Sequence, residues 1–84
     1  MTAIITVTFS NTNPGVSSVT ATHSGEAKTL TQSGTITFNH VLAGDIIMMQ
    51  GKSLGDSEFK IDISATPQDK KFPPGKINFN FIIL

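Results

Sequence analysis

The chain has 84 residues and balances six lysines against six acidic side chains, with no arginine and no cysteine. This length allows one domain with a thin core, and the lack of cysteine excludes disulfides, thiolate metal sites and cysteine nucleophiles. Nucleic-acid modules normally carry a basic face on which arginine contacts phosphate, so the charge balance argues against DNA or RNA as a partner.

Apolar and polar residues alternate along most of the chain, which is the pattern of half-buried β-strands. Glycines separate the alternating runs at intervals of about ten residues, a spacing typical of a sandwich or a barrel. Asn13-Pro14-Gly15 and Pro73-Pro74-Gly75 are turn sequences, because proline presets φ and glycine permits a positive φ. We predict seven strands, over residues 3–10, 16–23, 26–32, 34–41, 45–51, 57–65 and 76–84.

The second and fourth predicted strands each end near a histidine, His23 or His40. His23 is followed by Ser24 and Glu26, so the residue types of a serine hydrolase are close in sequence. Neighbours on a strand or turn point in different directions, however, and no G-x-S-x-G motif is present. A zinc site would need more ligands, and no H-x-H or H-x-x-x-H pair could anchor it. We therefore expect no enzyme activity, and we expect both histidines to lie at exposed strand ends.

Residues 45–51 are ambiguous because the run Ile46–Met49 would make both faces of a strand apolar. A buried strand and a single helical turn both fit this run. Gly44 and Gly51 enclose too few residues for a stable helix, so we favour the strand.

The segment from Gly34 to Ser64 resembles the middle of transthyretin-like and carboxypeptidase-regulatory-like domains, in which a strand enters a "nv-aGd" turn and then the next strand. The similarity covers about a third of the chain, and the residues that carry it are Phe38, Val41, Ala43, Gly44 and Asp45. The aromatic residue usual shortly after the glycine is replaced by Ile46 and Ile47. The resemblance implies a seven-stranded, immunoglobulin-like sandwich and brings no catalytic residues with it.

Acidic residues gather near the start of the predicted strand 57–65, where Asp56 and Glu58 are close and Asp62 shares the strand face of Glu58. Ca²⁺ is bound by several oxygen ligands that converge from a loop. Lys60 lies between Glu58 and Asp62 on this face, which favours a solvated face of balanced charge. We predict no metal and no cofactor, and Asp56, Glu58 and Asp62 are the weak candidates for a calcium site.

Phe72 is the one phenylalanine that falls in a predicted loop, beside Lys70 and Lys71. It can contact a partner or cover the edge of the core, and packing is the more common role. Carbohydrate-binding sandwiches usually present Trp or Tyr as a platform, and the chain has neither. For this reason a carbohydrate- or ligand-binding module, calcium-assisted or not, is only the alternative function and not the leading one.

The last predicted strand, KINFNFIIL, has an inward apolar row from Ile77 to Ile83. Ile82 and Leu84 make its second face apolar as well. Either the strand is covered on both faces by its own domain, or a second chain lies against it. We favour the second chain, because exposed hydrophobic edge strands are normally covered and pairing across a two-fold axis would cover this one.

We therefore expect an all-β fold, a single antiparallel sandwich of about seven strands over residues 1–84, with a small barrel as the alternative. The expected function is a non-enzymatic structural or adhesive module. It would bind protein, including a second copy of itself, through Ile82, Leu84 and Phe72. We find no apolar run long enough to span a membrane and no signal peptide. The chain is therefore expected to be cytoplasmic or to be a mature domain without its leader, and richness in Thr, Ser and Asn favours an extracellular or cell-surface location.

Overall fold

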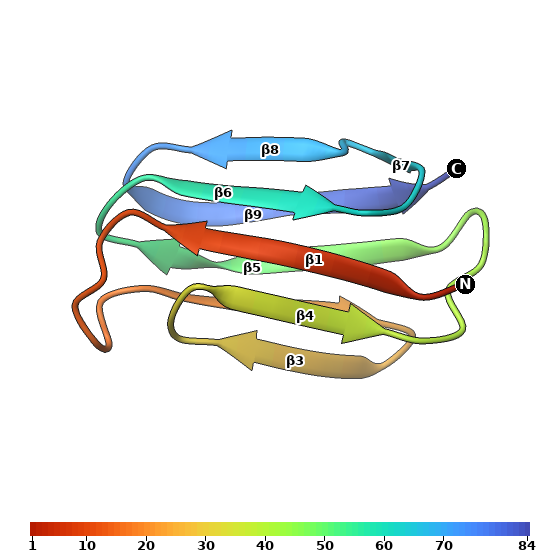
Figure 1. The fold of residues 1–84 in the computed structure, drawn as a ribbon, viewed down its shortest axis with the longest axis horizontal. Helices are drawn as coiled ribbons and strands as arrows, with labels where there is room; N and C mark the ends of the chain where they lie inside the picture. The colour runs from red at the N-terminus through yellow and green to blue at the C-terminus, as the bar shows by residue number, and fades with distance from the viewer.

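The computed structural model describes residues 1–84, and its regular elements are all β-strands. They form a four-stranded sheet in the order β4-β1-β6-β8 and a five-stranded sheet in the order β3-β2-β5-β9-β7, all pairs antiparallel. The predicted all-β sandwich is confirmed (Figure 1). The strands are β1 (Ala3–Phe9), β2 (Ser18–His23), β3 (Glu26–Leu30), β4 (Gly34–Phe38), β5 (Ile46–Ser53), β6 (Ser57–Ile61), β7 (Ala65–Thr66), β8 (Asp69–Phe72) and β9 (Gly75–Ile83).

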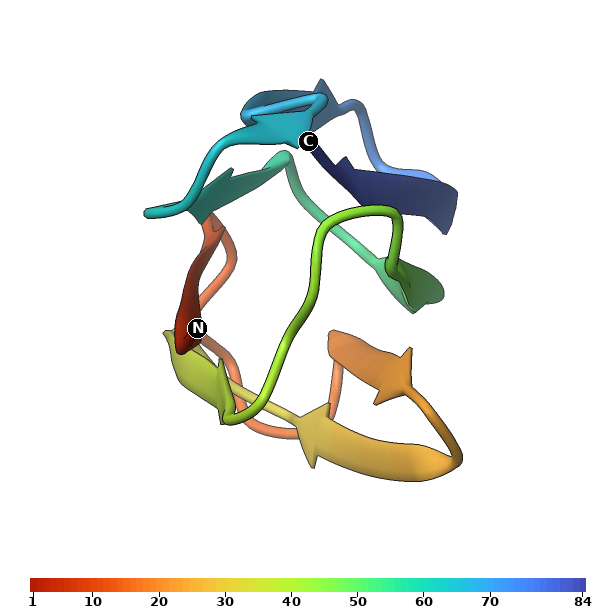
Figure 2. The same ribbon diagram turned by 90° about the vertical axis from the view of Figure 1, so that its right-hand side faces the viewer.

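The chain changes sheet at almost every connection, as the end-on view in Figure 2 shows. Only β2 and β3 are consecutive strands of one sheet. They are joined by Ser24 and Gly25, whose φ angles of 48° and 82° are both positive. Two-residue hairpin turns with two positive φ angles match the twist of the strands, so this turn fixes the register of the pair.

The core is the set of inward rows of the two sheets. In β1 buried and exposed residues alternate without exception, because successive side chains of a strand point to opposite faces. The largest fully buried side chains include Phe38, Phe59 and Phe81, one from β4, one from β6 and one from β9. The core is therefore made by rows from both sheets, as the alternation predicts.

The predicted strand 57–65 is wrong in extent, because it is two strands in different sheets. β6 ends at Ile61, and the chain then crosses so that β7 pairs with β9. The hydrogen bond from the backbone N–H of Asp62 to the carbonyl of Ile4 keeps the start of this crossing on sheet β4-β1-β6-β8. Residues 69–72, predicted as loop, form β8 beside β6, so the sandwich has nine strands rather than seven.

Residues 46–51 belong to β5, so the strand expected at 45–51 is confirmed and the helical turn is wrong. Ile47 and Met49 point into the core, whereas Ile46 and Met48 are exposed on the outer face. The structure contains no helix that could cross a bilayer.

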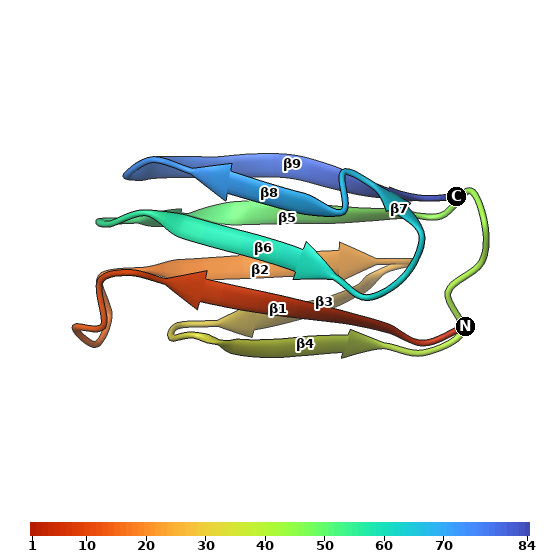
Figure 3. The ribbon, with the colours of Figure 1, turned by 45° about the horizontal axis from the view of Figure 1, so that its top comes forward.

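The connection from β4 to β5 crosses one end of the sandwich, between the two chain ends (Figures 2 and 3). Val41 exchanges backbone hydrogen bonds with Met1, whose charged amino group lies 3.0 Å from the Val41 carbonyl. On the other side, Ile83 donates to the carbonyl of Asp45 and accepts from the N–H of Gly44. This crossing segment, residues 39–45, therefore ties both ends of the chain to the body.

Candidate functional site: an uncharged outer sheet face

The outer face of the five-stranded sheet carries almost no charge. The side chains that point outward from it follow the pleat of five paired strands, and the Thr20–Thr29 hydroxyl contact of 2.8 Å lies on this side. Only Lys52 and Lys76 bring charge to it, as register partners at one end. We call the uncharged remainder the neutral face; its residues are Thr20, Thr22, Ala27, Thr29, Ile46, Met48, Gln50, Thr66, Asn78, Asn80, Ile82 and Leu84.

Four apolar side chains stand together at one end of the neutral face. Ile46 and Ile82 are direct register partners on β5 and β9, and Met48 is the next outward residue of β5. Ile46 is 50% exposed, Met48 42%, Ile82 44% and Leu84, just past the end of β9, 64%. We call Ile46, Met48, Ile82 and Leu84 the apolar patch. Isolated exposed apolar residues are ordinary, whereas a contiguous group marks a contact surface.

The outer face of the other sheet has the opposite character. Glu58 lies 3.7 Å from Lys60 and 3.5 Å from Lys71, measured between carboxylate oxygens and ammonium nitrogens. Asp69 is the register partner of Lys60 on the same face. This sheet exposes alternating positive and negative charges to solvent. The lack of charge on the neutral face is therefore a property of that sheet and not of both sheets.

Two of the three predicted interface residues belong to the apolar patch. Ile82 and Leu84 are exposed, so the explanation that their own domain covers the second face of this strand is wrong. Phe72 is half-buried at the end of β8, with its ring centroid 5.2 Å from that of Phe79 and 6.0 Å from that of Phe59. It packs against the core, which is the role that we considered the more common one.

Sequence reasoning did not place Ile46 and Met48 in this site. The sequence nevertheless indicated a second apolar face on this strand, because the run Ile46–Met49 is apolar throughout. Alternation assigns residues to faces and leaves neighbours open, so the pairing of Ile46 with Ile82 could not be foreseen.

His23 is buried rather than exposed, so the expectation of a surface strand end is wrong for this histidine; His40 is exposed as expected. His23 shares the inward row of β2 with Val19 and Ala21. Its Nε2 lies 2.8 Å from Oδ2 of Asp45, and its ring packs against Phe38 with centroids 5.5 Å apart. A carboxylate partner makes the burial of a polar ring tolerable.

Asp45 joins this pair to the crossing segment. Its Oδ2 also accepts a hydrogen bond from the N–H of Leu42 at 2.9 Å. The hydrogen bond with His23 and the one from Leu42 hold the pKa of the Asp45 carboxyl below its ordinary value of 3.8, against a partial opposing effect of burial. The His23–Asp45 pair therefore fixes the segment that leads directly into Ile46 of the apolar patch.

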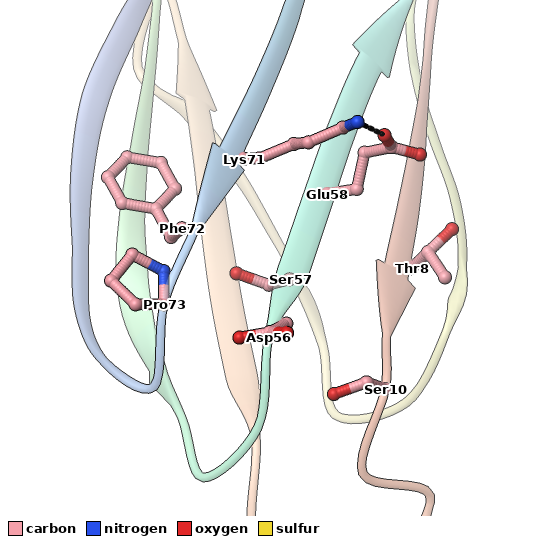
Figure 4. A pocket seen from close by; sticks show the side chains of 8 residues that line it. All are labelled: Thr8, Ser10, Asp56, Ser57, Glu58, Lys71, Phe72 and Pro73. Atoms are coloured by element: carbon pink, nitrogen blue, oxygen red, sulfur yellow. Dashed lines mark ion pairs between the residues drawn. The ribbon is translucent and has the colours of Figure 1, made fainter.

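A shallow groove of about 410 Å³ lies at the other end of the molecule (Figure 4). Lys71 and Glu58 point toward one another over β6, and Ser57 points toward the side of Phe72 and Pro73. The Ser57 hydroxyl is buried without a hydrogen-bond partner. Glu58 is held between two lysines, whereas Asp56, the residue before Ser57, also lines the groove and forms no ion pair.

The three weak calcium candidates do not converge. Asp56 and Asp62 flank the two ends of β6, which at about 3.3 Å per residue separates them by roughly 20 Å. The Oδ1 of Asp62 accepts the N–H of Ile4 at 2.9 Å, and Glu58 is paired with lysines. No three His, Asp or Glu side chains are grouped so that they could hold a metal ion.

The chain matches no protein-family model, no curated protein and no solved structure. The resemblance to transthyretin-like domains therefore stays a prediction, and so does the glycan-binding alternative, which a glycan array would test.

Proposed function

We propose that the protein is a non-enzymatic structural or adhesive interaction module that associates with a second copy of itself through the neutral face. The observation that supports this most directly is the apolar patch. Its four exposed side chains come from two neighbouring strands and have no charged residue among them. Burying such side chains gains about 25 cal/mol for each Å² removed from water.

The absence of charge favours a second copy over an unrelated partner. In a two-fold interface a residue of one copy meets a different residue of the other, and only residues near the axis meet their own kind. On a charged face, such as the sheet that carries Glu58 and Lys60, like charges would meet near the axis. The two lysines of this sheet lie at one end, outside the neutral face, and the threonine, asparagine and glutamine side chains can serve as a polar rim.

The size of the face sets an expected strength. Four strands about 4.8 Å apart and about 23 Å long project roughly 450 Å² per copy. Two such faces total roughly 900 Å², which is below the roughly 1,200 Å² of standard specific interfaces and in the range of weak, transient ones. We therefore expect a dimer with a dissociation constant on the order of micromolar.

Sedimentation equilibrium from about 5 to 500 µM, a range that spans a micromolar constant, tests the proposal. The wild type should shift from monomer to dimer, and the double variant Ile46→Thr/Ile82→Thr should stay monomeric. Threonine keeps the β-branched shape that strands favour, so the fold should survive. The matched control is Ile4→Thr, an exposed residue on the outer face of the other sheet, which should dimerise like the wild type. A monomeric wild type throughout the range would refute the proposal.

A further inference from the structure

β9 has an open edge over most of its length. β7 pairs with it only through Ala65↔Ile83 and Thr66↔Ile82. By Gln68 the chain has crossed to the other sheet, where the Gln68 carbonyl accepts the N–H of Ile61. From Gly75 to Phe81, β9 therefore has a neighbour on the β5 side alone.

The backbone of this open stretch is directed outward at every second residue. Ile83 donates its N–H to Asp45 on the β5 side, and Leu84 donates to Ser64 on the β7 side. Successive residues of an antiparallel strand alternate in this way. Lys76, Asn78 and Asn80 therefore direct their N–H and C=O groups to the open side, where no strand of the chain receives them.

An aromatic corner lies beside the open edge, between β8 and β9, which run along the same long side of the sandwich (Figures 1 and 3). Phe72 and Phe79 are only half-buried there, with centroids 5.2 Å apart. Lys70 shares the side of β8 on which Phe72 lies, and its Nζ is 5.5 Å from the Phe72 ring centroid. An added strand would cover apolar ring surface as well as backbone.

Two of the three lysines without an acidic partner, Lys70 and Lys76, lie beside this edge. Lys28, Lys60 and Lys71 each lie within 4.0 Å of a glutamate. The other three form no ion pair: Lys76 on β9, its register partner Lys52, and Lys70 in the aromatic corner. The nearest acid on β8, Asp69, points to the outer face opposite Lys60.

We propose that the open edge of β9 binds an extended acidic peptide segment of another protein as an additional strand. The backbone of β9 from Lys76 to Asn80 would supply the pairing, as in strand addition at other exposed sheet edges. Acidic side chains of the peptide would meet Lys70 and Lys76, and an apolar one would cover Phe79. A second copy fits less well, because β9 itself carries no acidic side chain that could meet these lysines. This edge is separate from the apolar patch, so the proposal does not depend on self-association.

The probe is a capped octapeptide of alternating Glu and Val, compared with one of alternating Lys and Val. NMR titration of labelled protein should show shifts at Lys76, Asn78 and Asn80 with the glutamate peptide and none with the lysine peptide. No binding of the glutamate peptide, equal binding of both, or shifts confined to the neutral face would each overturn the proposal.

Two pairs of variants test the mechanism. Asn78→Pro removes an outward N–H while leaving the β5 side intact, and should abolish binding, whereas Asn78→Ala keeps the N–H and should bind. Lys70→Glu should weaken binding by about tenfold or more through charge reversal, and Lys60→Gln on the opposite outer face should have no effect. The amide spectrum of each variant checks its fold. Retained binding by a folded Asn78→Pro variant would overturn the proposal. It would also be overturned if the wild-type protein associates with itself through this edge and Asn78→Pro abolishes that association.

Discussion

Gly51 lies within β5 at a point where a side chain has no room. A Cβ atom there would come within 2.0 Å of the Ser18 carbonyl oxygen and 2.7 Å of the Val19 Cα, both backbone atoms of β2. Backbone cannot rotate away as a side chain can. We expect Gly51→Ala to lower the free energy of unfolding in urea by about 3 kcal/mol or more. Gly34→Ala is the control, since its Cβ would meet Leu30 at an ordinary 3.6 Å; equal losses would contradict the close approach of β2 and β5.

The His23–Asp45 pair makes stability depend on acid pH. The folded state lowers the pKa of the Asp45 carboxyl below 3.8, chiefly through the His23 hydrogen bond. Its contribution to stability is therefore present above pH 3.8 and is lost as the pH falls through the lowered value. We expect the free energy of unfolding of Asp45→Asn, measured in urea between about pH 2 and 6, to fall less steeply below pH 4 than that of the wild type.

The control for this series is Asp56→Asn, because Asp56 makes no side-chain hydrogen bond or ion pair. It should follow the wild-type curve. Parallel curves for Asp45→Asn and the wild type would show that the pair does not contribute to the acid sensitivity of the fold.

At the scale of single elements, the two rows of β9 should respond differently to truncation. Ile83 is fully buried and lies in the core, whereas Leu84 is exposed. We expect Ile83→Ala to lower the free energy of unfolding by about 2–4 kcal/mol, and Leu84→Ala to change it by less than about 0.5 kcal/mol. Chemical denaturation at a concentration below dimer formation measures both. A large loss from Leu84→Ala in the monomer would mean that its side chain packs within the domain.

Strands with a clear alternation could be predicted from the sequence, and strands that depend on partners could not. The alternation of Ile5, Val7 and Phe9 places β1 correctly, because one face of that strand is in the core. Asp69–Phe72 carries three charges in four residues, and only pairing with β6 makes it a strand. The break after Ile61 leaves no mark in the alternation, since Ile63 continues it while the chain changes sheet.

The candidate site shows the same limit. Ile82 and Leu84 could be recognised from the sequence because both faces of the last strand were apolar at its end. The neutral face as a whole could not be recognised, since it is assembled from five strands whose order follows from long-range pairing. The pair of buried His23 and half-buried Asp45 joins residues 22 positions apart, and no local spacing indicates it.

Over the whole molecule the charges are distributed unevenly, and this makes the two proposed surfaces separable by salt. The neutral face buries apolar side chains without ion pairs, so dimerisation should be unchanged or slightly stronger when NaCl rises from about 50 to 500 mM, as hydrophobic contacts are not screened. The open edge of β9 relies on Lys70 and Lys76, whose charges are exposed to water and screened over about 10 Å or less. Binding of the glutamate peptide should therefore weaken several-fold over the same range. Sedimentation equilibrium and NMR titration of one protein sample at each salt concentration measure both. If the two responses move together, a single surface serves both interactions and the separation of the neutral face from the open edge is wrong.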